Sequence, residues 1–192
     1  MEKFILSLIS EKVTIENKIV GFKPPKQGFK KRISDWIANR NWRKFKKNNQ
    51  GFPLIELTNV LNLLDEKIKP ENRTFVITVT SENQEGIQIV HSYLNNDYLK
   101  SRSKEFGISV YLTFDKTFEE TIPLLKKFKE RRNNFENLNF FIHDEEVECY
   151  DIYCETDKSK VLGTVESYFK EIVGEKGNIK YYFSINEMGK VE

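Results

Sequence analysis

Apolar and polar positions alternate through much of the C-terminal half of the chain, and this period of two predicts strands with one buried face. The clearest run covers residues 108–114, in which every second residue is large and apolar: Ile108, Val110, Leu112 and Phe114. The same rule predicts three further strands: residues 138–142, 146–154 and 179–185. These four strands set the frame of the predicted fold.

Two helices are predicted between these strands. Thr117 and Glu120 have the spacing of a capping box, and Pro123 moves the expected start of this first helix toward residue 122. Asp157 or Ser159 is expected to cap the second helix, and Gly174 to end it. The apolar positions of that helix fall on one side: Leu162, Val165, Phe169 and Ile172.

The resulting order, β-α-β-β-α-β over about residues 107–185, predicts an α+β fold with a ferredoxin-like unit. In such a unit, two helices cover one face of a four-stranded antiparallel sheet. An alternative is that the same elements belong to one larger mixed sheet that includes residues 73–80. Many unrelated proteins share this element order, so it indicates architecture but no function.

The N-terminal half is predicted as a hairpin and helical extension. Residues 3–20 suit a hairpin, and residues 57–68 have helical spacing after Pro53. A strand is expected at 73–80, followed by a helix whose apolar stripe comprises Ile87, Val90, Leu94 and Tyr98. We therefore expect an N-terminal region at 1–70 and a sheet region at 71–192, or one compact domain.

Composition predicts a folded, cytoplasmic protein. The 192 residues include 15 Phe, 8 Tyr and 2 Trp, which is enough apolar area for a core despite 31% charged residues. The only apolar run near the N-terminus, residues 4–9, is too short for a signal peptide or a membrane span. Cys149 and Cys154 are five residues apart on a predicted strand, so they point to opposite faces and are not expected to pair.

The sequence lacks the motifs of the commonest enzyme classes. It has no glycine-rich phosphate loop, no G-x-S-x-G, no H-E-x-x-H and no C-x-x-C, and its two histidines are His91 and His143. Neither histidine has a partner at a useful spacing. The acidic cluster from His143 to Glu148 is interpreted as a solvated hairpin tip rather than a metal site. We therefore predict no catalytic residues, no metal and no cofactor.

Charge is distributed unevenly along the chain. Residues 23–47 contain ten basic residues and one acidic residue, whereas residues 133–192 contain 13 acidic and 6 basic residues. The basic segment supports a nucleic-acid interface, because lysine and arginine neutralise phosphates and Trp36, Trp42 and Phe45 have rings that stack on bases. The candidate contacts are Lys30, Lys31, Arg32, Arg40, Arg43 and Lys44. The competing interpretation is that the aromatic residues are core and the lysines solvated.

A second candidate surface follows from strand parity. We expect Ile108, Val110 and Leu112 to face the helices. The other face of the sheet would then carry Tyr111, Phe141 and Tyr182. Aromatic residues are favoured binding anchors, and nearby carboxylates would attract a basic partner: Asp144, Glu145, Glu148 and Asp151. These seven residues form the predicted partner surface. The alternative is that N-terminal helices cover this face.

The preferred function is a non-catalytic binding protein that inhibits or regulates a protein partner. A small chain with an acidic aromatic half and a basic half resembles toxin-immunity proteins in physical character, although this analogy rests on composition alone. The alternative is a nucleic-acid-associated protein that uses residues 23–47. A metal-dependent hydrolase or nuclease comes third.

Overall fold

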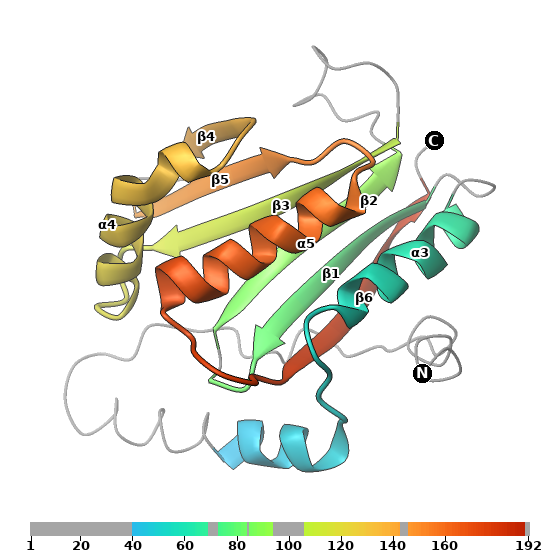
Figure 1. Cartoon of the computed structure of the whole chain (residues 1–192), viewed down its shortest axis with the longest axis horizontal. Helices are drawn as coiled ribbons and strands as arrows, with labels where there is room; N and C mark the ends of the chain where they lie inside the picture. The colour runs from blue at the N-terminus through green and yellow to red at the C-terminus, as the bar shows by residue number, and fades with distance from the viewer. Residues whose placement is uncertain (1–39, 69–72, 84, 94–105, 143–145, 191–192) are drawn as a thin grey trace.

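The computed structural model describes residues 40–68, 73–83, 85–93, 106–142 and 146–190 (Figure 1). A helix at residues 40–48 comes first. The labelled elements follow in the order α3 (Glu56–Ile68), β1 (Arg73–Ser81), β2 (Gly86–Tyr93), β3 (Phe106–Asp115), α4 (Thr121–Arg131), η2 (Arg132–Asn134), β4 (Leu138–Ile142), β5 (Val147–Tyr153), α5 (Lys158–Ser167), η3 (Tyr168–Val173) and β6 (Tyr181–Lys190). The predicted N-terminal hairpin and most of the basic segment lie outside the described residues.

Within the described residues, six strands form one sheet in the order β4-β5-β3-β2-β1-β6. Every pair of neighbours is antiparallel. The expectation of an α+β fold is therefore confirmed, and the larger sheet that includes residues 73–80 is the arrangement found. It is antiparallel rather than mixed.

The ferredoxin-like unit is not confirmed. In that fold the last strand would pair with β3, but β6 pairs with β1 instead. The β1–β2 hairpin lies between β3 and β6 and separates them. The three-strand part β3-β5-β4 does have the expected order, with β5 between the two strands that α4 connects. The local sequence gave no signal for the long-range choice made by β6.

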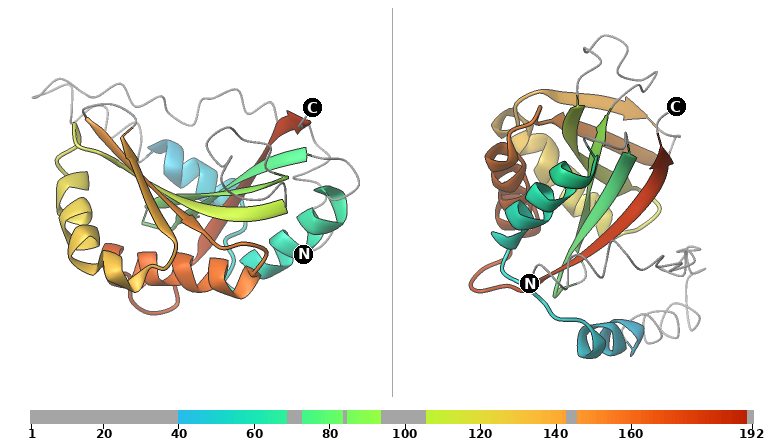
Figure 2. Two further views of the ribbon diagram at one scale, coloured as in Figure 1. Left: turned by 90° about the horizontal axis from the view of Figure 1, so that it is seen from above. Right: turned by 90° about the vertical axis from the view of Figure 1, so that its right-hand side faces the viewer.

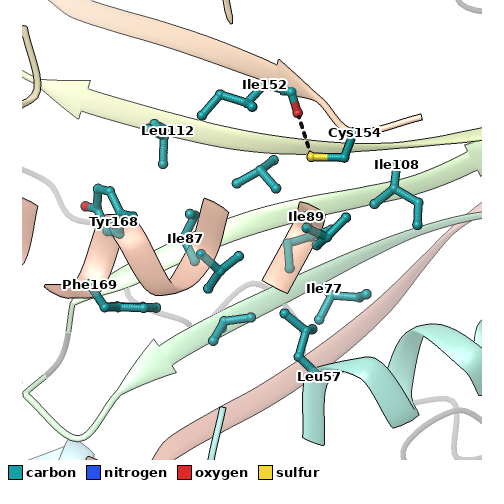
Figure 3. Close-up of a cluster of buried hydrophobic side chains, with 14 of the residues drawn as sticks. Leu57, Ile77, Ile87, Ile89, Ile108, Leu112, Ile152, Cys154, Tyr168 and Phe169 are labelled. Carbon is teal, nitrogen blue, oxygen red and sulfur yellow. Dashed lines mark hydrogen bonds between the residues drawn. The ribbon is translucent and has the colours of Figure 1, made fainter. Parts of the chain in front are cut away.

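Period-two burial explains why these segments are strands and where the core lies. On β3, Ile108, Val110, Leu112 and Phe114 are all buried on the face covered by helices. Helices α3, α4 and α5 lie on that one face of the sheet (Figures 1 and 2). Their apolar residues meet the strands in a continuous cluster, part of which is shown in Figure 3. Phe169 and Tyr168 close this cluster from η3, where α5 continues as a π-helical stretch.

The predicted helix from Ile87 to Tyr98 is wrong within the described residues, because residues 86–93 form strand β2. Ile87, Val90 and Leu94 fit a helical stripe, but Ile87, Ile89 and His91 also fit a period of two. Pairing with β1 and β3 on both sides decides in favour of the strand, because it satisfies the backbone groups of β2 from both neighbours.

The helix caps were predicted with mixed success. Asp157 caps α5 as expected, because its side chain accepts hydrogen bonds from the backbone N–H groups of Ser159 and Lys160. Gly174 ends η3 with a φ of 87°, which a residue without a Cβ adopts at little cost. Thr117 does not cap α4. Its N–H and hydroxyl both donate to Asp115, and the helix begins at Thr121.

A buried polar cluster joins β2 to two helices. His91 is fully buried, and its Nε2 lies 2.9 Å from Oδ1 of Asp65 on α3. Lys158, the first residue of α5, forms an ion pair with Asp65 and donates a hydrogen bond of 2.7 Å to Asn62. Burial lowers the pKa of His91 to about 4, although Asp65 opposes that shift. The imidazole is therefore neutral in the folded protein at neutral pH.

This depressed pKa makes folding sensitive to acid. The unfolded chain binds a proton at His91 below about pH 6.5, whereas the folded chain does so only near pH 4. We expect acidification from pH 7 to 4 to remove up to about 3 kcal/mol of stability through this residue. His91→Gln keeps a donor toward Asp65 but cannot gain a proton. As the pH falls from 7 to 4, His91→Gln should therefore become more stable relative to the wild-type protein by that amount. Urea denaturation of both proteins at each pH measures the two free energies of unfolding. A constant difference would contradict the assignment.

Candidate functional site

Strand β4 forms an apolar edge of the sheet. It pairs with β5 on one side, and no described strand pairs with its other side. Its five residues, LNFFI, include no charged residue and no proline, which are two of the usual means of protecting an exposed edge. Phe140, at the centre of the strand, is 52% exposed. Such an edge presents unpaired backbone groups beside an exposed aromatic ring.

The opposite edge of the sheet, strand β6, is bridged at its start by another part of the chain. Phe52 forms a β-bridge with Tyr181 at the start of β6, with two backbone hydrogen bonds of 2.8 Å. The pairing of β6 with β1 is also interrupted by a register shift at Thr74 and Phe75, which bends an edge away from partners. The chain thus covers one end of β6 itself. Among the described strands, β4 has no such bridge along its outer side.

An open hollow of about 730 Å³ adjoins the edge strand. We call it the β4 hollow and define it by its lining residues: Lys129, Arg132, Asn133, Phe135, Leu138, Phe140, Glu148 and Tyr150. Its walls are the last turn of α4, η2, β4 and β5, so a helix end and a sheet edge enclose it. The lining combines an aromatic floor with charged groups.

Aromatic rings in tilted and edge-to-face contact form the floor of the hollow. The ring of Tyr150 lies 5.0 Å from that of Phe140 and 4.7 Å from that of Phe128, measured between centroids. Phe128 also contacts Phe135 at 5.3 Å. Rings at these distances and tilts attract each other in addition to burying apolar area. The ring of Phe140 therefore packs on Tyr150 at one side, while its other side stays exposed to solvent.

The carboxylate of Glu148 contacts two lysines and a tyrosine hydroxyl at the hollow. Nζ of Lys129 lies 2.8 Å from its Oε2, Nζ of Lys116 lies 3.7 Å from its Oε1, and the Tyr150 hydroxyl donates to Oε2 at 2.9 Å. Burial raises the pKa of Glu148, but these hydrogen bonds and the two lysine charges outweigh burial and lower it. Burial, together with the Glu148 charge, raises the pKa of Tyr150 to about 12. At neutral pH the carboxylate is thus ionised and the phenol is protonated.

These groups suit binding better than catalysis. Glu148 is engaged by both lysines, and a phenol with a pKa of about 12 is a poor acid or base at neutral pH. Cys154 lies in the core, where burial raises its thiol pKa to about 11 (Figure 3). A thiol in that state is not a nucleophile at neutral pH. Within the part of the chain that the structure describes, no three His, Cys, Asp or Glu side chains gather as they would around a metal ion.

The residues predicted to form one aromatic and acidic surface do not lie on a single surface. Tyr182 is on β6, at the far edge of the sheet from β4, and is only 7% exposed. Tyr111 and Asp151 are register partners on the sheet face away from α3, α4 and α5, where Tyr111 is half-buried and Asp151 is 5% exposed. Glu148 faces the helices, in the β4 hollow.

The remaining members of that set are only partly described. Phe141 is in β4, where its backbone is in register with Cys149. Asp144 and Glu145 lie outside the described residues, as does His143. Of the seven residues, only Glu148 lines the hollow. Phe141 belongs to β4, the strand that forms one wall of the hollow. Phe140, Tyr150, Lys129 and Arg132 were missed, because no sequence pattern indicates which strand will be an edge.

Part of the basic segment packs on the sheet. In the helix at residues 40–48, the ring of Trp42 lies 5.3 Å from that of Tyr182 and that of Phe45 lies 5.6 Å from it. Trp42 Nε1–H donates to the carbonyl of Glu82 at 3.1 Å. These contacts place the helix on the sheet face away from α3, α4 and α5 (Figure 2). The two rings cover Tyr182 rather than presenting themselves for stacking on bases.

The predicted nucleic-acid contacts divide between described and undescribed parts of the chain. Arg40, Arg43 and Lys44 are exposed on the helix at residues 40–48. Lys30, Lys31 and Arg32 lie outside the described residues.

Cys149 and Cys154 are buried and form no disulfide bond, as expected from their spacing.

Comparisons with known proteins identify no relative: no family model, curated protein or solved structure matches this chain. None of the helices in the described segments is long and apolar enough to cross a membrane.

The packing of Trp42 predicts a structural role for this side chain. Trp42→Ala removes its contact with Tyr182 and its hydrogen bond to Glu82, so it should lower the free energy of unfolding by about 2 kcal/mol. Arg43→Ala, an exposed control on the same helix, should change it by less than about 0.5 kcal/mol. Urea denaturation of both variants measures the difference. Unchanged stability in Trp42→Ala, with weakened binding to single-stranded DNA, would instead favour a role in nucleic-acid contact.

The geometry around Glu148 predicts a change in the titration of Tyr150. Glu148→Gln removes the negative charge beside the phenol, so the pKa of Tyr150 should fall below about 12 yet stay above 10, because the ring remains buried. The measurement is a pH titration of the tyrosine Cζ resonance by NMR, with Glu146→Gln as the control for an exposed neighbour on the same chain segment. An unchanged pKa in Glu148→Gln would contradict the hydrogen-bonded arrangement.

Proposed function

We propose that this protein is a non-catalytic binding protein that docks another protein at the outer edge of β4 and the β4 hollow. The observation that carries the proposal is the exposed ring of Phe140, at the centre of an uncharged, unpaired edge strand and beside an aromatic-lined hollow. A single exposed ring is common on protein surfaces, but one that continues into an aromatic-lined hollow beside unpaired backbone groups offers a contiguous surface to a partner. Edge strands also offer main-chain hydrogen bonds to a partner.

Docking at this edge is proposed to inhibit or regulate the partner, in the manner of an immunity protein. The hollow supplies the rigid aromatic contacts that act as binding anchors, and its charged groups add specificity. We further propose that the protein works in the cytoplasm. The two buried, unpaired cysteines support that proposal, because thiols persist in reducing compartments.

A nucleic-acid interface on the basic segment is less well supported. Its two described rings, Trp42 and Phe45, contact Tyr182. Stacking on bases would require them to leave that packing. We therefore retain protein docking as the proposed function.

The role of Phe140 is tested by charge insertion. Phe140→Asp places a carboxylate in the aromatic lining of the hollow and should remove a partner that co-purifies with the wild-type protein in stoichiometric amount, a loss of at least about tenfold in affinity. Ile122→Asp is the matched control, since Ile122 is 50% exposed on α4 but does not line the hollow. Both side chains are about half exposed, so Ile122→Asp also controls for the stability lost when a half-buried apolar side chain is replaced by a carboxylate. Melting temperatures of both variants show that they remain folded.

The readout is size-exclusion chromatography with light scattering, followed by titration of the purified partner. Retention of the same partner by Phe140→Asp, with the wild-type dissociation constant, would contradict docking at β4. So would a native protein purified without any stoichiometric protein partner.

A further inference from the structure

We propose that the segment bound at the β4 hollow is an extended strand that carries an apolar side chain and, two residues along on the same face, a carboxylate. This inference rests on the proposed docking function and specifies the partner of that same site. It follows from the direction of the β4 backbone groups, the lining of the hollow and the charge at its rim.

The backbone of β4 determines the conformation of the partner. The N–H of Tyr153 donates to the carbonyl of Asn137, and β4 is in antiparallel register with β5 from Leu138 onward. In an antiparallel pair, the residues whose backbone groups bond to the neighbour alternate with those whose groups point away. The backbone groups of Leu138, Phe140 and Ile142 therefore point outward. Only another extended strand satisfies three outward-pointing positions at this spacing.

The floor of the hollow determines the first side chain. A strand added outside β4 places every second side chain on the face covered by α4, next to Phe140 and over the hollow. The apolar part of the lining consists of Phe135, Leu138, Phe140 and Tyr150. An aromatic or large aliphatic side chain buries itself against these groups and covers the exposed side of Phe140. A polar side chain at this position would lose its hydration without gaining a partner.

The rim determines the second side chain. Lys129 and Lys116 both pair with Glu148, so that carboxylate is already neutralised within the chain. Arg132, also in the lining, forms no ion pair among the described residues, and it is exposed beside Asn133. A guanidinium in this state is complementary to a carboxylate. Residues two apart on a strand share a face and are separated by about 7 Å, so an apolar side chain and a carboxylate at this spacing both face the lining of the hollow.

A foreign segment suits this site better than a second copy of the same strand. The residues of β4, LNFFI, contain no carboxylate, so pairing of β4 with itself would leave Arg132 without a partner. Charge complementarity therefore favours an acidic strand from another protein.

Three acetylated and amidated octapeptides test the inference. TVTFTETV carries phenylalanine and glutamate two apart on one face, TVTFETTV has the same composition with the glutamate on the other face, and TVTFTKTV replaces the carboxylate by an amine. We expect TVTFTETV to shift the amide resonances of β4 in NMR titrations and to bind about tenfold more tightly than the other two. In Arg132→Glu the preference should reverse toward TVTFTKTV. Lys126→Glu, at an exposed position of α4 outside the lining, is the control.

The outcomes separate this inference from the proposed function. If all three peptides bind equally and Phe140→Asp abolishes each, the carboxylate requirement is wrong and docking at β4 stands. If no peptide shifts β4, the extended-strand proposal is overturned, whereas docking is judged by partner loss in Phe140→Asp. A stable dimer that Phe140→Asp dissociates would replace the foreign strand by a second copy.

Discussion

Burial of one face of a six-stranded antiparallel sheet under α3, α4 and α5 is the constraint on which the rest of the structure depends. Because side chains alternate along a strand, each strand must present every second residue to the helices, and the registers of five strand pairs are fixed together. The central strand β3 carries this constraint most fully, with four large apolar residues buried on one face. A shift of one residue in the register of a strand would turn its buried side chains to the opposite face. The order of the strands places β4 and β6 at the two edges.

The two edges differ in how far the described chain covers them. At β6 the chain covers the start of the strand, through the bridge from Phe52 to Tyr181 and the packing of Trp42 and Phe45 on Tyr182. At β4 it supports an aromatic ring from below, through Tyr150 and Phe128, and leaves the outer side exposed. An exposed apolar edge favours non-specific association. Retaining one beside a hollow with a charged rim is consistent with a selective docking site.

The sequence allowed the local elements to be predicted well and their assembly poorly. Strong alternation identified β1, β3, β4 and β5, and the chemistry of Asp157 and Gly174 located the ends of the α5 and η3 segment. The segment after Gly86 failed because its apolar residues fit both a helical and a strand period. The partner of β6 could not be predicted, since nothing in residues 181–190 distinguishes β1 from β3 as a neighbour.

The candidate site depended on that same non-local information. Parity correctly placed Tyr111 and Tyr182 on the face opposite the main helices, but two strands, β2 and β1, lie between them. Glu148 was expected to be free to attract a basic partner, whereas Lys129 and Lys116 neutralise it within the chain. Arg132 and Phe140 gained significance only once η2 and the edge strand were placed together. Charge counts along the sequence could not supply that juxtaposition.

Amide hydrogen exchange along β4 in the free protein tests the open edge most directly. The outward-pointing N–H groups of Leu138, Phe140 and Ile142 should exchange rapidly, while those of Asn139 and Phe141, which point to β5, should be protected. NMR resolves these five amides individually. Alternating protection along the strand would support an edge that is available to a partner. Equal, strong protection at all five positions would show that the outer side of β4 is already paired and would contradict the account.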